Sequence, residues 1–199
     1  HLSVAPVPVL SLLAPKLARA TVLLWLAFFM VMLSFYFVLS WTPTLLTEAG
    51  LNVEQGISGG VLVNIGGVIG GVFLGYFTAR FAVTKLVALF MVMCAIAMIA
   101  FGLLQSGLSL MLIFGFVIGF FIFGSMIGLY AITPNIYATE IRNTGMGWAI
   151  GIGRIGAVVG PLIAGFLLDR GWSGADCFVV FAVPLIIAMF AVLSMKQSE

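Results

Sequence analysis

The sequence has little charge: only 7% of its 199 residues are Asp, Glu, Lys or Arg, whereas 63% are hydrophobic. A soluble domain could not cover so much apolar surface with so few polar residues, so we predict a membrane protein. Histidine is also scarce, since His1 is the only one, and no acidic residue lies inside a long apolar run. Side chains for a metal site or an acid–base centre are therefore lacking, and we predict no enzyme activity, no metal and no other cofactor.

The few cysteines and charges exclude further classes. Cys94 and Cys177 are too few for a disulfide framework, and we interpret both as packing residues. The net charge of +2 is small and the basic residues are scattered, which argues against a nucleic-acid partner. The chain opens on His1 rather than Met and has no signal-peptide pattern, which we interpret as a segment of a longer protein.

Six apolar runs are long enough to cross a bilayer as helices, for which about 20 residues are needed. They cover residues 21–46, 57–79, 83–104, 108–132, 145–168 and 177–195. Pro6, Pro8 and Pro15 mark residues 1–20 as a linker or short interfacial segment. We therefore predict an all-α membrane protein whose residues 21–199 form one six-helix unit.

The basic residues orient these spans, because Lys and Arg gather in short cytoplasmic loops. One set of joints and ends carries six basic residues: Lys16, Arg19, Arg80, Lys85, Arg142 and Lys196. The opposite joints carry a single basic residue and most of the acidic ones: Arg170, Glu48, Glu54, Asp169 and Asp176. Both termini are therefore predicted to be cytoplasmic.

Glycine is concentrated in the second and fifth runs. Small residues four apart let helices approach closely in lipid, so we expect these runs to pack against protein and the third and sixth to face lipid. An offset of 90 residues superimposes the two glycine-rich runs, as these pairs show: Gly66 and Gly156, Gly70 and Gly160, Gly75 and Gly165, Arg80 and Arg170. Because one run passes inward and the other outward, we predict two three-helix halves related by an inverted repeat, which is typical of secondary transporters.

The stretch GIGRIG, residues 151–156, matches the pattern of a dinucleotide-binding turn. That turn needs a strand before the glycines and an aqueous groove, whereas this stretch lies within one apolar run, so we reject a cofactor site. Arg154 remains, about ten residues into the span and near the middle of the bilayer. An ionisable residue at that depth favours a functional site, and an anionic ligand is the preferred partner; a structural arginine bonded to neighbouring helices is the alternative.

Two stretches of the sequence carry a family resemblance. The stretch YATEIRNTGMGWAIGIGRIGAVVGPLIAG, residues 137–165, resembles the span ten to eleven region of the aromatic acid:proton symporters of the major facilitator superfamily. The opening LLAPKLARATVLLWLAFFMVML, with the later SWTPTLLTEAG, resembles the seventh span of that family. The resemblance implies the C-terminal half of a twelve-span permease in a bacterial inner membrane, which imports benzoate-like aromatic acids with protons. Its partners would be the substrate, protons, the lipid bilayer and either the N-terminal half or a second copy of this half.

The chain departs from the family pattern in two respects. The cytoplasmic loop motif of the superfamily survives only as GYFTARFAVTK, in which Ala79 replaces the expected acid. The acidic motif of the first family span is not in this sequence, so proton coupling is expected to reside in the other half. Transport of another small organic anion, and a homodimeric anion carrier or channel, remain the alternatives.

The resemblance also ranks the candidate residues. Arg154 is the first candidate for the substrate carboxylate, and Arg142 with Glu140 is a candidate for gating or coupling, with an ordinary cytoplasmic loop charge as the alternative for Arg142. Asn64 becomes a substrate-binding candidate because the repeat superimposes it on Arg154, although a helix-packing role is the alternative. Side chains on the two spans that would line the cavity complete the set, as ring-stacking or hydrogen-bonding groups: Tyr36, Ser40, Phe121, Ser125 and Tyr130. For Tyr130, a place in the aromatic belt at the membrane surface is the alternative.

Overall fold

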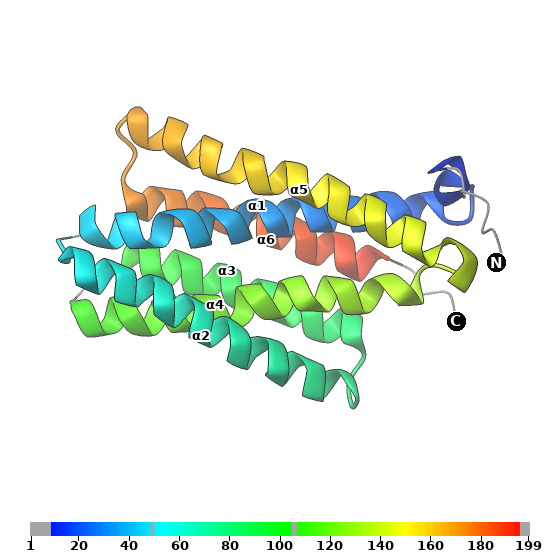
Figure 1. The fold of residues 1–199 in the computed structure, drawn as a ribbon, viewed down its shortest axis with the longest axis horizontal. Helices are drawn as coiled ribbons and strands as arrows, with labels where there is room; N and C mark the ends of the chain where they lie inside the picture. Colours follow the sequence, from blue (N-terminus) through cyan, green and yellow to red (C-terminus); the bar gives the residue numbers. More distant parts are fainter. Residues whose placement is uncertain (1–8, 49, 105–106, 196–199) are drawn as a thin grey trace, which may run out of the picture.

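The fold is a bundle of six long helices, seen in a computed structural model that describes residues 9–48, 50–104 and 107–195 (Figure 1). The long helices, in chain order, are α1 (Ala18–Glu48), α2 (Val53–Thr78), α3 (Val83–Leu103), α4 (Leu108–Ile132), α5 (Thr139–Asp169) and α6 (Gly174–Ser194). Two 3-10 helices, η1 (Val9–Leu13) and η2 (Thr133–Asn135), precede α1 and follow α4. The described residues contain no strand, so the prediction of an all-α protein with six membrane-spanning helices is confirmed.

Several helices extend beyond the apolar runs that predict them. Helix α5 begins at Thr139, six residues before the expected boundary at Gly145, and therefore includes Glu140 and Arg142. We expected these two residues in the joint between the fourth and fifth spans, and in the structure they lie in the first turns of the helix that carries the fifth span. Hydropathy marks only the lipid-facing part of a helix, whereas backbone hydrogen bonding continues into the polar region, where an acidic residue such as Glu140 also favours a helix start.

Both ends of the described chain lie at one end of the bundle, together with the α2–α3 and α4–α5 connections (Figure 1). Here η1 packs onto the bundle: Leu12 is fully buried and its carbonyl accepts a hydrogen bond from Thr21 Oγ1 at 2.8 Å. Tyr137, in the α4–α5 connection, donates to Thr21 Oγ1 at 3.1 Å. Burial raises the pKa of the Tyr137 hydroxyl, and the hydrogen bond to Thr21 opposes that rise. Residues 1–8 of the expected linker lie outside the described part of the chain.

The inverted repeat appears in the way the glycine helices pack. Helix α5 packs on α1, where Gly156 lies against the carbonyl of Phe29 and Gly160 against that of Leu33. Helix α2 packs on α4 in the same way, with its repeat-related glycines at the corresponding carbonyls: Gly66 at Phe116 and Gly70 at Phe120. In each contact an added Cβ would collide with backbone, so glycine is required where the helices touch.

Two further observations support the repeat. Residues 61–70 and 151–160 follow the same order of buried, intermediate and exposed positions, except at positions 69 and 159. The Arg80 guanidinium lies over the Tyr76 ring at 5.3 Å, and at the opposite end of the bundle Arg170 lies over the Phe166 ring at 4.1 Å. The second pair lies 90 residues after the first, with Phe166 at the position of Tyr76 and Arg170 at that of Arg80. The two halves therefore share side-chain geometry as well as helix order.

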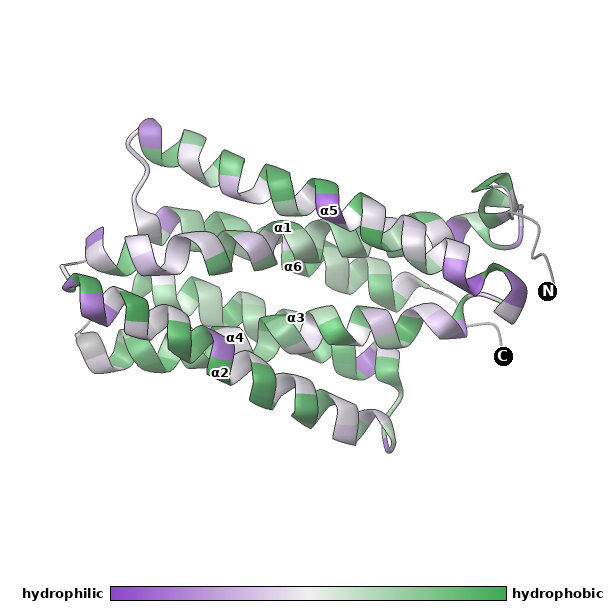
Figure 2. Cartoon of the chain, in the orientation of Figure 1, coloured by the Kyte–Doolittle hydropathy of each residue, from purple (hydrophilic) through white to green (hydrophobic). Residues whose placement is uncertain are grey.

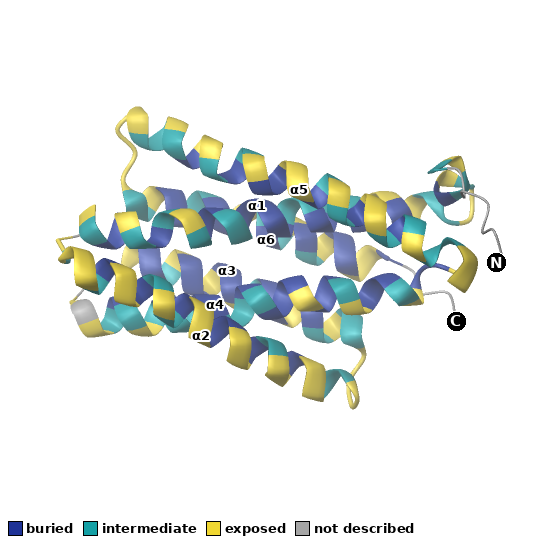
Figure 3. Cartoon of the chain, in the orientation of Figure 1, coloured by how far each residue is buried: buried dark blue, intermediate teal, exposed yellow. Residues whose placement is uncertain are grey.

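The third and sixth spans, which we expect to face lipid, do keep an exposed apolar side, with Leu89 and Ile96 of α3 and Phe190 of α6 each more than half exposed. Helices α3 and α6 pack against each other and are 56% and 44% buried over their most apolar stretches, whereas α2 and α5 are 33% and 28% buried. The reason is geometric, because a glycine face brings two backbones close but buries little side-chain area. One side of α2 and one side of α5 therefore remain exposed and apolar (Figures 2 and 3).

Candidate functional site

Arg154 lies midway along α5 and reaches across to α1. Its Nη1 donates to the hydroxyl of Tyr36 at 2.6 Å, and its guanidinium carbon lies 6.0 Å from the centre of the Tyr36 ring. Both distances suit a hydrogen bond combined with a weak cation–π contact. Gly153 and Gly156, on either side of Arg154 in sequence, lie against Met32 and the Phe29 carbonyl, which holds the two helices together at this level.

Among the residues that the structure describes, the charge of Arg154 has no acidic neighbour along the membrane-spanning helices. The acidic residues of the described helices lie near helix ends: Glu48, Glu54, Glu140, Asp169 and Asp176. On α5 itself, Glu140 and Asp169 are each about 20 Å from Arg154 along the helix axis, at a rise of about 1.5 Å per residue. The Arg154 side chain is exposed in this chain. A guanidinium carries five N–H donors, and the bond to Tyr36 uses one of them.

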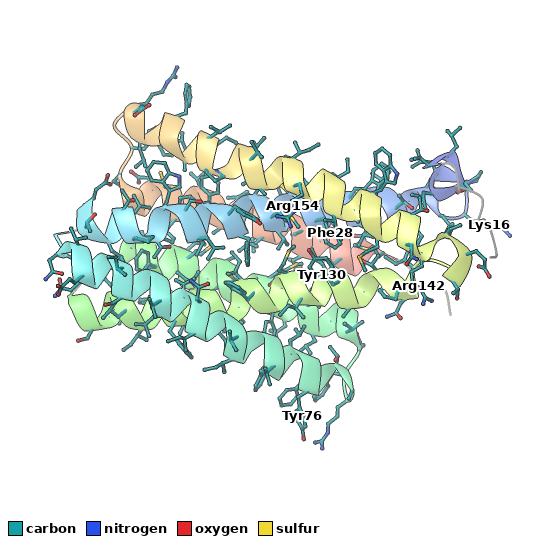
Figure 4. The ribbon with its side chains drawn as sticks, in the orientation of Figure 1. Lys16, Phe28, Tyr76, Tyr130, Arg142 and Arg154 are labelled. Carbon is teal, nitrogen blue, oxygen red and sulfur yellow. The ribbon has the colours of Figure 1, made fainter. Side chains whose placement is uncertain are left out.

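Two more rings lie near this arginine, on α1 and α4. The ring of Tyr130 meets that of Phe28 edge to face at 5.4 Å, and Tyr130 lies within electrostatic range of both Arg154 and Tyr36. Figure 4 shows Arg154, Phe28 and Tyr130 together in the middle of the bundle. The cluster is therefore one exposed cation bonded to Tyr36, with the Tyr130–Phe28 ring pair nearby.

Asn64 lies on the exposed side of α2. Its Nδ2 donates to the carbonyl of Gly60 on the same helix at 2.9 Å. That carbonyl can only accept, so the amide orientation is fixed and Oδ1 points away from it as an acceptor. The described contacts of Asn64 do not include Arg154.

The remaining predicted residues do not join the Arg154 cluster. The Phe121 ring packs against Phe90 of α3 at 5.2 Å, and Ser125 is fully buried with its hydroxyl bonded to the Phe121 carbonyl at 2.8 Å. Phe121 and Ser125 are one turn apart and share a helix face, whereas Tyr130 is nine residues from Phe121 and hence on the opposite face. Ser40 is exposed, one turn beyond Tyr36 on α1.

Arg142 and Glu140 lie apart from the cluster, in the first turns of α5. Arg142 is twelve residues, or about 18 Å of helix, from Arg154. Its Nε is buried and has no hydrogen-bond partner among the described residues, while Glu140 is exposed. Figure 4 shows Arg142 toward the end of the bundle that also carries Lys16.

A groove of about 520 Å³ runs along the exposed side of α5. It is lined by Thr144, Gly147, Trp148, Gly151, Ile152 and Ile155. A Cβ added at Gly147 or Gly151 would meet no atom within 4 Å, so neither glycine is required for packing inside this chain. The groove is an apolar surface beside Arg154 rather than part of its hydrogen-bonded cluster.

Sequence reasoning missed Phe28 and Phe123, which lie next to the predicted residues. Phe28 contacts Tyr130, and Phe123 contacts Phe35, the neighbour of Tyr36, at 4.7 Å. The chain contains 18 phenylalanines, so composition and hydropathy do not distinguish these two from the others. Their spacing from Tyr36 and Tyr130 becomes informative only when the helix contacts are known.

Comparison with known proteins is consistent with this architecture. Residues 24–198 match the family described as the Major Facilitator Superfamily. The chain is 32% identical to the gallate transporter of Pseudomonas putida, over 94% of this chain and 42% of that protein. It is 36% identical to the 3-(3-hydroxy-phenyl)propionate transporter of Escherichia coli, over 93% of this chain and 46% of that protein. The chain thus spans less than half the length of these relatives.

A solved structure supports the fold alone. The Escherichia coli fucose:proton symporter superimposes with a TM-score of 0.81 at 14% sequence identity, over 92% of this chain and 45% of that chain. The described helices therefore correspond in arrangement to about half of a solved transporter.

Proposed function

Because the chain belongs to the Major Facilitator Superfamily, we propose that it supplies the C-terminal half of a permease for an aromatic carboxylate. Its relatives include transporters named for gallate and 3-(3-hydroxy-phenyl)propionate, and it is not an enzyme. The observation that carries the proposal is Arg154: a cation midway along a membrane-spanning helix, bonded to Tyr36 and without an acidic neighbour on the spanning helices.

The energetic cost of that cation supports an anionic ligand. A charged side chain at mid-membrane costs about 2.5 to 3.5 kcal/mol on insertion scales, so an intramembrane arginine is rarely retained without a partner. A guanidinium binds a carboxylate through two parallel hydrogen bonds, which are stronger where water is excluded. We therefore assign the substrate carboxylate to the free donors of Arg154, with Tyr36 beside them.

The surrounding side chains favour an aromatic substrate over other small anions. Tyr36 is bonded to the guanidinium, and Tyr130, whose ring meets that of Phe28 edge to face, lies within its electrostatic range. An aromatic ring stacks on such groups in an offset or edge-to-face geometry, whereas a compact inorganic anion gains nothing from them. A homodimeric anion channel has no comparable observation in its favour.

The remainder of the proposal concerns coupling, partner and orientation. Since no acidic side chain lies at mid-membrane in the described helices, we assign proton coupling to the rest of the full-length transporter. We propose that the N-terminal half covers the exposed apolar sides of α2 and α5. The alternative partner for these surfaces is a second copy of this six-helix half. The positive end of the bundle, with Lys16 and Arg142, would face the cytoplasm across the inner membrane, and Arg142 with Glu140 would act in gating there.

Substitution at Arg154 in the full-length transporter tests the proposal. Arg154→Lys keeps the charge but loses the two-pronged geometry, so benzoate affinity should fall about tenfold; Arg154→Ala should abolish measurable binding and uptake. Both variants should reach the membrane in normal amounts.

The matched control is Arg170→Ala, which removes an arginine from the far end of the same helix. It should leave affinity unchanged. If Arg154→Ala binds benzoate normally but is less abundant or less thermostable, Arg154 is a structural residue and the proposed function fails.

A further inference from the structure

The repeat relates Arg154 and its aromatic neighbour to a second pair of residues. The helix contacts align Phe29 and Leu33 of α1 with Phe116 and Phe120 of α4. Continued by one turn, the same register aligns Tyr36 with Phe123, just as the offset of 90 residues aligns Arg154 with Asn64. The repeat therefore relates two pairs of residues: Arg154 with Tyr36, and Asn64 with Phe123.

Contacts around Phe123 agree with this correspondence. The Phe123 ring fills the space next to Gly67 on α2, where any side chain would collide with it, and Gly67 is less than one turn from Asn64. On the other side, Phe35 contacts both Phe123, at 4.7 Å, and Tyr36, at 5.5 Å. Tyr36, Phe35 and Phe123 thus form a continuous aromatic layer from the Arg154 side of the bundle to the Asn64 side.

The two ends of this layer differ in chemistry. Arg154 offers N–H donors and a positive charge. Asn64 offers Oδ1, an uncharged acceptor, because its Nδ2 is bonded to the Gly60 carbonyl. Both side chains are exposed, and both lie on the same side of the bundle. The repeat is a two-fold relation that exchanges α1 with α4 and α2 with α5, and it moves the position of Arg154 to that of Asn64 on this same side.

We propose that Asn64 determines specificity by accepting a hydrogen bond from a ring hydroxyl of the substrate; this rests on the proposed function. With the carboxylate at Arg154 and the ring on the aromatic layer, a hydroxyl on the far side of the ring points toward Asn64. A site built to bond a hydroxyl discriminates against the analogue that lacks it, because the acceptor is then left unpaired. The transporter therefore prefers hydroxylated aromatic acids to benzoate.

The experiment compares 4-hydroxybenzoate with benzoate in binding to the full-length transporter. The wild type should bind 4-hydroxybenzoate about tenfold more tightly than benzoate. Asn64→Leu, which has a similar size but no acceptor, should bind benzoate like the wild type and 4-hydroxybenzoate only as well as benzoate. Asn64→Ala should give the same loss of preference, so the test does not depend on one variant folding.

Ser58→Ala is the matched control, because Ser58 is also exposed on α2 and also bonds a carbonyl four residues back, that of Glu54. It should keep the tenfold preference. A preference retained in both Asn64 variants, a wild type that prefers benzoate, or an equal loss for both acids would overturn the role of Asn64 and leave Arg154 untouched. Failure of the wild type to bind either acid, or normal binding of both by Arg154→Ala, would instead overturn the proposed function.

Discussion

At the scale of single residues, the orientation of the Arg154 guanidinium is set by its bond to Tyr36. A guanidinium on a long flexible stem binds a planar anion well only when its orientation is restricted. Tyr36 restricts it by accepting from Nη1, and the hydroxyl of Tyr36 keeps its own proton for a second acceptor. A carboxylate placed beside Arg154 can thus receive hydrogen bonds from both side chains.

Removal of that hydroxyl gives a prediction at this scale. Tyr36→Phe keeps the ring but loses one hydrogen bond, which is worth about 0.5 to 1.5 kcal/mol, so benzoate affinity should fall by about 2- to 12-fold. Equilibrium binding to the full-length transporter measures the effect, with Tyr76→Phe at the end of α2 as the control that should change nothing. Unaltered affinity in Tyr36→Phe would mean that the hydroxyl contributes nothing to carboxylate binding.

At the scale of helices, glycine has two different roles in this chain. Gly66, Gly70, Gly156 and Gly160 lie where a backbone carbonyl of the facing helix leaves no room for a Cβ. Gly75 and Gly147 lie on the same two helices, and a Cβ added there would meet no atom within 4 Å. The glycine pattern of the sequence therefore mixes contact positions with open ones.

The same substitution at both kinds of position separates them. Gly66→Ala and Gly156→Ala should each destabilise the protein by about 1 to 3 kcal/mol, because a methyl group must displace backbone atoms. Gly75→Ala and Gly147→Ala should be neutral or slightly stabilising, since alanine is favoured over glycine inside a helix by about 0.5 to 1 kcal/mol. Thermal unfolding in detergent measures all four, and equal effects at the four sites would contradict the packing described here.

At the scale of the whole molecule, the two ends of the bundle differ in charge. Lys16 and Arg142 lie at the end that holds both chain ends (Figure 4), as does Arg19 in the first turn of α1, and the opposite end carries most of the acidic residues. Short basic loops stay in the cytoplasm during membrane insertion. The six-helix unit should therefore have a single orientation, with the two ends of α2 on opposite sides of the membrane.

Cysteine labelling tests this orientation. Val53 is the first residue of α2 and Phe81 follows its other end; they are 70% and 58% exposed, and the native Cys94 and Cys177 are buried and can be replaced by alanine. In intact cells an impermeant thiol reagent should label Val53→Cys from outside, whereas Phe81→Cys should react only after permeabilisation. The reverse pattern would invert the assigned topology.

Part of this architecture is readable from the sequence. Long apolar runs separated by short polar joints can satisfy their backbone hydrogen bonds in lipid only as helices, so six spanning helices follow from hydropathy. The overlay of glycines predicts the repeat, and the structure bears it out in the contacts of Gly66 and Gly156. The depth of Arg154 follows from its position within one run.

The composition of the candidate site depended on the tertiary structure. Tyr36, Tyr130, Phe121 and Ser125 are equally suitable by residue type, yet only the two tyrosines lie near Arg154, while Phe121 packs toward α3. Hydropathy does not reveal which face of a helix points where, because nearly every face of these helices is apolar. That choice is made by the glycine contacts, which set the rotation of each helix against its neighbour and so decide which side chains meet.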